Sequence, residues 1–153
     1  EKYVLTLANL LFAIGLKPED IICSSVSGCS IPLNEDIYEF LRQQFQKQSL
    51  HVLFILSDNY YNSPASLNEM GAAWVVQACY TSILLPGFTF ESIRGAINPR
   101  KIAIKLDSSE YDLKEKLGQL KDNLIKEFQL PALQSIHWER IRDEFIAKIT
   151  SGK

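Results

Sequence analysis

Paired cysteines, an excess of one charge and long apolar runs are all lacking in this chain of 153 residues. Its 3 cysteines form no Cys-x-x-Cys pair and it has only 2 histidines, so neither disulfides nor a metal site is indicated. The 16 basic residues nearly balance the 18 acidic ones, which argues against direct binding of nucleic acid or of a membrane surface. No apolar run approaches the roughly 20 residues that span a bilayer. The expected class is a globular, cytoplasmic protein of about one domain's length.

Helical periodicity is what the chain does have, and it is strong at both ends. Within Lys2–Ile14 apolar residues recur with the spacing of an amphipathic helix, and Gly15 suits its C-terminal end. Ser63 and Pro64 are residue types favoured at an N-cap and at the first helical position, so a helix is predicted from there to about Tyr80. Further helices are predicted at 36–48, 91–97, 112–128 and 135–149.

Short apolar segments between these helices predict strands. His51–Ser57 is almost wholly apolar, which is typical of a central strand covered on both faces. Segment 101–106 alternates between apolar and polar residues, which predicts a strand near the edge of a sheet. The other two predicted strands are 21–23 and 82–85. Strands that alternate with helices predict an α/β fold, a flavodoxin-like parallel sheet flanked by helices.

The ligand crevice of such a sheet lies beyond the carboxyl ends of its strands. The loops predicted there are 24–34, 58–62 and 86–89. A sheet of this kind normally opens on a strand, whereas this chain opens on a helix, so its first strand is expected to be missing from the chain. We expect an α/β domain at 1–130 and a C-terminal helical extension at 131–153, which is a candidate interface if its helix does not fold onto the core.

A sequence motif occupies residues 52–74. An apolar strand ends in a serine, a loop with two tyrosines follows, and two serines and a glutamate open the next helix. The motif positions are Ser57, Tyr60, Tyr61, Ser63, Ser66 and Glu69. This order resembles the bacterial TIR (Toll/interleukin receptor) domain, in which a cysteine usually stands at the position of Ser66. The resemblance covers about residues 2–128 and implies the TIR fold.

The resemblance also implies an activity, the cleavage of NAD+ with Glu69 as the catalytic residue. Enzymatic TIR domains are NAD+ nucleosidases, which release nicotinamide and leave ADP-ribose or a cyclic form of it. The nicotinamide leaving group is already cationic and needs no general acid, and one carboxylate can stabilise the oxocarbenium-like transition state. A single glutamate therefore suits this reaction better than glycosidase chemistry with two carboxylates. NAD+ is the substrate, and no cofactor is implied.

Other residues around Glu69 are candidates by the same resemblance. The candidates for substrate binding are Ser24, Ser25, Ser57, Tyr60, Tyr61 and Ser66. The candidate gating loop is Ser27, Gly28, Cys29, Ser30 and Ile31, where Gly28 allows unusual backbone angles. Structural alternatives stay open: the serines as caps or turn residues, the tyrosines as loop packing, and Glu69 as a surface residue matched to a helix dipole.

Three functions are compatible with these observations. The first is an NAD+ hydrolase or cyclase acting as a bacterial antiphage-defence effector or signal producer, activated by self-association with other TIR domains and by a fused or partner sensor domain. The second is a non-enzymatic TIR adaptor or scaffold that binds other TIR domains. The third is an enzyme like the nucleoside deoxyribosyltransferases, which share the architecture and use a glutamate nucleophile.

Overall fold

A computed structural model provides the structure of the chain. The residues it describes are 2–23, 39–40, 42–44, 50–75 and 77–151. The chain divides into two compact units. The first, here called the terminal unit, comprises Glu1–Ile31 and Ser109–Lys153. The second, here called the sheet unit, comprises Pro32–Ser108.

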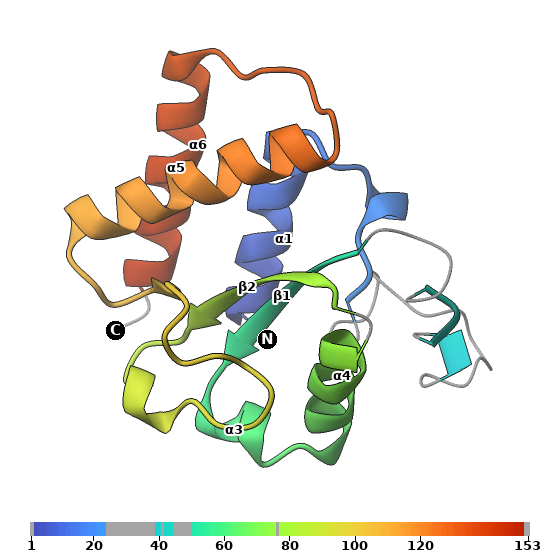
Figure 1. Cartoon of the computed structure of the whole chain (residues 1–153). Coiled ribbons are helices and arrows are strands. Elements are labelled where there is room, and N and C mark those ends of the chain that lie inside the picture. Colours follow the sequence, from blue (N-terminus) through green and yellow to red (C-terminus); the bar gives the residue numbers. More distant parts are fainter. Residues whose placement is uncertain (1, 24–38, 41, 45–49, 76, 152–153) are drawn as a thin grey trace. The chain divides into compact units, whose positions relative to one another are not determined.

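The terminal unit is helical. Its elements are α1 (Lys2–Ile14), the 3-10 turn η1 (Pro18–Asp20), α5 (Glu110–Glu127) and α6 (Ser135–Thr150). Helices α1 and α6 pack against each other, so the two ends of the chain share one unit (Figure 1). Between α5 and α6, the Lys114 ammonium lies 3.5 Å from a carboxylate oxygen of Asp143. The Lys121 ammonium lies 5.5 Å from the centre of the Trp138 ring.

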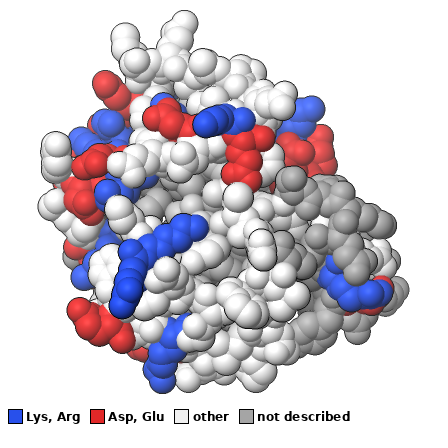
Figure 2. Space-filling model, in the orientation of Figure 1, with Lys and Arg blue, Asp and Glu red and all other residues white. Residues whose placement is uncertain are grey.

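Each long helix of the terminal unit buries one apolar stripe, as its periodicity predicts. The buried residues of α1 are Leu7, Ala8, Leu10, Leu11 and Ile14, and those of α5 and α6 are Leu113, Leu117, Leu120, Leu124, Trp138, Phe145 and Ile149. On the face shown in Figure 2, acidic and basic side chains lie beside one another over α5. This arrangement is that of amphipathic helices with a mixed-charge outer face.

The sheet unit contains a parallel sheet, which confirms the α/β class. In the described residues it has three strands in the order β1 (His51–Leu56), β2 (Cys79–Leu84) and β3 (Ile104–Lys105). The register pairs His51 with Cys79 at the start of β1, and the short strand β3 pairs with the end of β2 through Ile104 and Ile83. The strand predicted at 101–106 is present only as the two residues of β3, which lie at one edge of the sheet as expected. By contrast, β1 was predicted to be central and lies at the other edge of this described sheet.

Helix α4 (Pro64–Val75) and the segment between β2 and β3 cover one face of the sheet. The core on that face consists of Phe54, Leu56, Met70, Ala73, Leu84, Phe88, Ile93, Ile97 and Ala103. These residues come from β1, α4, β2 and the β2–β3 connection, and the connection contributes four of them whereas the helix contributes two. The sheet and α4 thereby hold the end of β1 and the start of α4 in a fixed relation.

The end of α4 and the start of β2 differ from the prediction. The helix ends by Val75 rather than near Tyr80, and β2 already begins at Cys79. The Gln77 amide donates to the Trp74 carbonyl at 3.1 Å, and the Ala78 amide donates to the Ala73 carbonyl at 3.0 Å. These two bonds close a Schellman motif, with Gln77 in the left-handed region at φ 53°. The sequence has neither glycine nor proline here to mark the end.

Three smaller predictions are also corrected. Segment 21–23 is not a strand, and its first residue belongs to the turn η1, since the Ile21 amide donates to the Pro18 carbonyl at 3.3 Å. The predicted helix at 91–97 is a single 3-10 turn, Phe90–Ser92. The predicted loop at 58–62 contains the one-turn helix α3 (Asp58–Tyr61). The helix predicted at 36–48 lies largely outside the described residues, of which 39–40 and 42–44 are helical.

Within residues 2–23, 39–40, 42–44, 50–75 and 77–151, no helix is both long enough and apolar enough to cross a bilayer.

Candidate active site

The segment Ser57–Ser66 joins β1 to α4 and is here called the β1–α4 corner. Two serine caps give it its shape. The Ser57 hydroxyl accepts the Tyr60 amide at 3.2 Å and caps α3. The Ser63 hydroxyl accepts the Ser66 amide at 3.3 Å, which confirms Ser63 as the N-cap of α4 with Pro64 in its first turn.

Glu69 lies in the second turn of α4 and is half-buried. Ser66 precedes it by three residues, so the two side chains lie on the same face of the helix. Burial, and then the nearby Glu69 carboxylate, raise the pKa of Tyr60 above its ordinary value. The Tyr60 hydroxyl therefore keeps its proton throughout the physiological pH range.

Tyr60 points into the corner. Its hydroxyl donates to the Ser66 carbonyl at 3.0 Å. Its ring meets the Phe54 ring edge-on, at 6.4 Å between ring centres and 73° between planes. The side chain thus contacts β1 through its ring and α4 through its hydroxyl.

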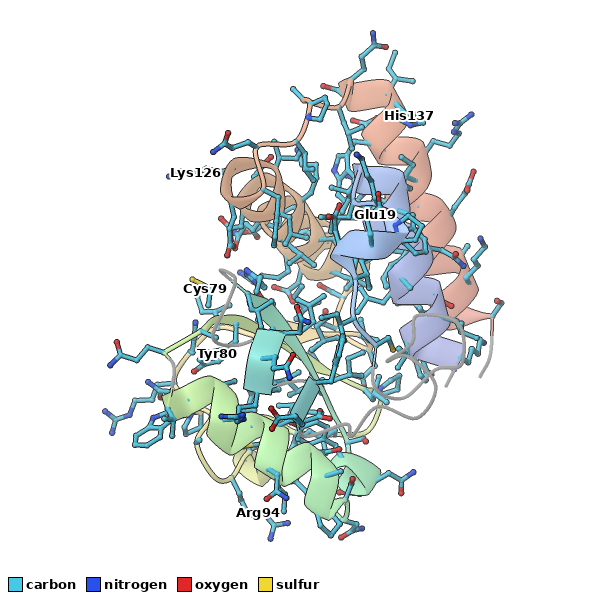
Figure 3. The ribbon with its side chains drawn as sticks, turned by 90° about the vertical axis from the view of Figure 1, so that its right-hand side faces the viewer. Glu19, Cys79, Tyr80, Arg94, Lys126 and His137 are labelled. Carbon is cyan, nitrogen blue, oxygen red and sulfur yellow. The ribbon has the colours of Figure 1, made fainter. Side chains whose placement is uncertain are left out.

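Tyr61 is held by a different part of the sheet unit. Its hydroxyl donates to the Arg94 carbonyl and accepts the Arg94 amide, both at 3.1 Å. Its ring stacks on Phe88, with 5.7 Å between ring centres and 12° between planes. Arg94, labelled in Figure 3, also places its guanidinium 5.8 Å from the centre of the Tyr61 ring. Tyr61 therefore ties α3 to the β2–β3 connection.

Five of the predicted site residues come together in and beside this corner: Ser57, Tyr60, Tyr61, Ser66 and Glu69. Three of them have structural contacts that the sequence left as alternatives, since Ser57 is a cap and both tyrosines pack the loop. Their contact with substrate stays a prediction. Ser24, Ser25 and the gating loop, Ser27, Gly28, Cys29, Ser30 and Ile31, lie outside the described residues.

A cavity of about 250 Å³ lies on another side of α4. Its wall includes Met70 and Trp74 from α4, Phe54 from β1 and Tyr80 from β2, but not Glu69. Figure 3 shows Tyr80 near the C-terminal end of α4. Most of the described residues in its wall are apolar, and Glu69 is not among them, so the cavity is distinct from the corner.

Sequence reasoning missed a polar contact at the carboxyl ends of β2 and β3. The Asp107 carboxylate accepts the Gly87 amide at 3.0 Å, and the Lys105 ammonium lies 3.5 Å from its other oxygen. The Gly87 hydrogen bond is the main cause that lowers the pKa of Asp107, and Lys105 adds to it. Its place in the sequence could have indicated Asp107, because it is the first acidic residue after β3, at the edge where the strands of a parallel sheet end together.

The sheet and its helices make this an α/β protein. The corner and the half-buried Glu69 form its candidate site at the carboxyl end of β1. No protein-family model matches the chain. The chain is similar to the protein named "Uncharacterized protein YddK" from Bacillus subtilis (strain 168), with 39% identity over 143 residues. The match covers 92% of this chain and 50% of that relative, so the chain spans about half the length of the curated relative it matches.

Proposed function

We propose that the chain is a TIR-type NAD+ nucleosidase that cleaves the bond between nicotinamide and ribose, with Glu69 as its catalytic residue. The observation that carries the proposal is the position of Glu69, half-buried in the second turn of a helix that starts just beyond the carboxyl end of β1. Ligands of parallel α/β sheets bind at that edge. The motif that resembles TIR domains supplies the substrate class.

The proposed chemistry needs one carboxylate. Nicotinamide leaves as a neutral molecule from a cationic ring, so the bond to ribose breaks without protonation of the leaving group. The ribose carbon then carries the developing positive charge, which a carboxylate held nearby stabilises. Glu69 is the acidic residue of α4, and partial burial strengthens its field because water screens it less. Water or a second group of the same molecule completes the reaction and gives linear or cyclic ADP-ribose.

The cellular setting belongs to the same proposal. We place the protein in the bacterial cytoplasm, where NAD+ is available, as an antiphage-defence effector or signal producer. A fused or partner sensor domain and self-association with other TIR domains would control its activity. The resemblance to bacterial TIR domains supports this setting, and the relative from Bacillus subtilis supports a bacterial context.

Nicotinamide release from NAD+ tests the proposal. Concentrated protein is incubated with NAD+, and the Glu69→Ala variant is compared with Glu91→Ala, which removes an exposed carboxylate from the β2–β3 connection of the same unit. We expect Glu69→Ala to lower kcat by roughly 100-fold or more, because it removes the group that stabilises the transition-state charge. Glu91→Ala should retain activity. Equal activity in the two variants would refute the catalytic assignment of Glu69.

A non-enzymatic scaffold is the second candidate function. The outward side of α4 favours it, because Leu67, Trp74 and Val75 are 41%, 66% and 71% exposed. Exposed apolar side chains on one helix are typical of protein interfaces. The absence of nicotinamide release at every protein concentration, together with concentration-dependent self-association in sedimentation, would favour the scaffold over the nucleosidase.

A further inference from the structure

We infer that Tyr60 is a positioning residue, which fixes the first turn of α4 and thereby the direction in which Glu69 points. This inference rests on the proposed function. It differs from the prediction that Tyr60 binds substrate, because it assigns the hydroxyl to the protein's own backbone.

Tyr60 uses three of its polar groups within the β1–α4 corner. Its amide donates to the Ser57 hydroxyl at 3.2 Å, and its carbonyl accepts the Ser63 amide at 3.2 Å. Its hydroxyl donates to the Ser66 carbonyl at 3.0 Å. One residue therefore binds the cap of α3, the cap of α4 and the first turn of α4.

The hydroxyl bond is placed where it can affect Glu69. Ser66 precedes Glu69 by three residues, and one turn of an α-helix contains 3.6 residues, so both lie on one side of α4. The Tyr60 ring rests against Phe54 in the buried core of the sheet unit. The hydroxyl therefore links a fixed point in the core to the helix turn before the carboxylate.

The chemistry of the corner keeps this link intact. Burial and the Glu69 charge both raise the pKa of Tyr60, so its hydroxyl remains a donor wherever the enzyme would work. The Ser66 carbonyl is a backbone acceptor and does not titrate. A carboxylate that must face a reacting carbon benefits from such a fixed turn, because a misplacement of about 1 Å can cost about 100-fold in rate.

Tyr80 provides the matched control. Tyr60→Phe and Tyr80→Phe each remove one hydroxyl that bonds to the backbone and leave a ring beside Phe54, but the Tyr80 hydroxyl accepts the Asn98 amide rather than bonding to α4. We expect Tyr60→Phe to lower kcat for NAD+ about ten-fold with KM changed less than about two-fold, since a displaced catalytic group affects the chemical step. Tyr80→Phe should change neither constant by more than about two-fold.

A second variant tests the helix turn without touching either tyrosine. Ser63→Ala removes the cap of the same turn and should also lower kcat. Because both changes act on one turn, the double variant Tyr60→Phe/Ser63→Ala should lose less than the product of the two single losses. Amide hydrogen exchange over residues 66–70 should speed up in Tyr60→Phe and not in Tyr80→Phe.

Each result decides the matter. A raised KM with unchanged kcat in Tyr60→Phe would place its hydroxyl on the substrate and overturn the inference. Equal losses in the two tyrosine variants would also overturn it, because the effect would then be general destabilisation. If the unaltered protein releases no nicotinamide, the proposed function fails, and the exchange measurement alone judges Tyr60: faster exchange confined to the start of α4 supports positioning, and unchanged exchange refutes it.

Discussion

At the scale of single residues, polar side chains just after the strands accept hydrogen bonds from backbone amides. Ser57 follows β1 and caps α3, while Asp107 follows β3 and accepts the Gly87 amide from the end of β2. Such contacts hold the loops that a ligand would meet. The Asp107 hydrogen bond stabilises the fold most when the carboxylate is ionised, because an ionised carboxylate is the stronger acceptor.

Acid should weaken the sheet unit through Asp107. Its pKa is lowered in the folded protein, chiefly by the Gly87 hydrogen bond, so its contribution is present above the unfolded pKa of about 3.9 and disappears as the pH falls through the folded pKa. We expect the stability difference between the unaltered protein and Asp107→Asn to be constant between about pH 5 and pH 7 and to shrink below about pH 4. Thermal unfolding across that range measures it. A difference that stays constant down to about pH 2 would contradict the assignment.

Residue types alone predicted part of the candidate site, and the remaining contacts could be seen only in the structure. Ser63 was predictable as a cap because serine before proline is a local signal that needs no partner. The role of Tyr60 was not, because its hydroxyl acceptor is a backbone carbonyl that any residue at position 66 would provide. Asp107 was missed for a similar reason, since its partner Gly87 lies 20 residues away in the chain.

At the scale of elements, helix ends decided which boundaries could be predicted. Helix α1 ends as predicted because Gly15 takes the left-handed conformation, with φ 121°. Gln77 after α4 and Gln129 after α5 take a similar conformation, at φ 53° and 52°, where glutamine gives no sequence signal. Apolar periodicity alone predicted a longer α4, but the hydrogen bonds after the helix end it earlier, and β2 begins at Cys79.

Glycine at these positions should stabilise the protein. After α5, the Leu130 amide donates to the Ile125 carbonyl at 3.0 Å, so Gln129 occupies the position at which glycine is usually found. We expect Gln129→Gly to raise the free energy of unfolding by about 0.5–1 kcal/mol, because a side chain with a β-carbon is strained there. Gln119→Gly, within the same helix and exposed, should lower it by about 1 kcal/mol. Chemical denaturation of both variants measures the pair, and a loss of stability in both would refute the motif.

At the scale of the whole molecule, both ends of the chain belong to one compact unit. Residues 131–153 were predicted as an extension to a domain of residues 1–130, and that boundary stays a prediction. Helix α6 nevertheless packs against α1, and the described part of the terminal unit includes buried Trp138, Phe145 and Ile149 on α6. If α6 were detached, these three side chains would become exposed to water.

Removing α6 should therefore cost far more than trimming an appendage. A chain ending at Leu130 lacks the helix against which α1 packs, and we expect it to lose cooperative thermal unfolding. Two point variants locate the cause without shortening the chain. Phe145→Ala, at a position 4% exposed, should lower the free energy of unfolding by about 3–4 kcal/mol, whereas Ile136→Ala, at a position 84% exposed, should change it by less than about 0.5 kcal/mol. Unfolding of the shortened chain at the temperature of the full chain would show that α6 is an independent extension. A large loss of stability in Phe145→Ala would contradict such independence, because only a helix packed against the rest of the unit passes the cost of the cavity on to it.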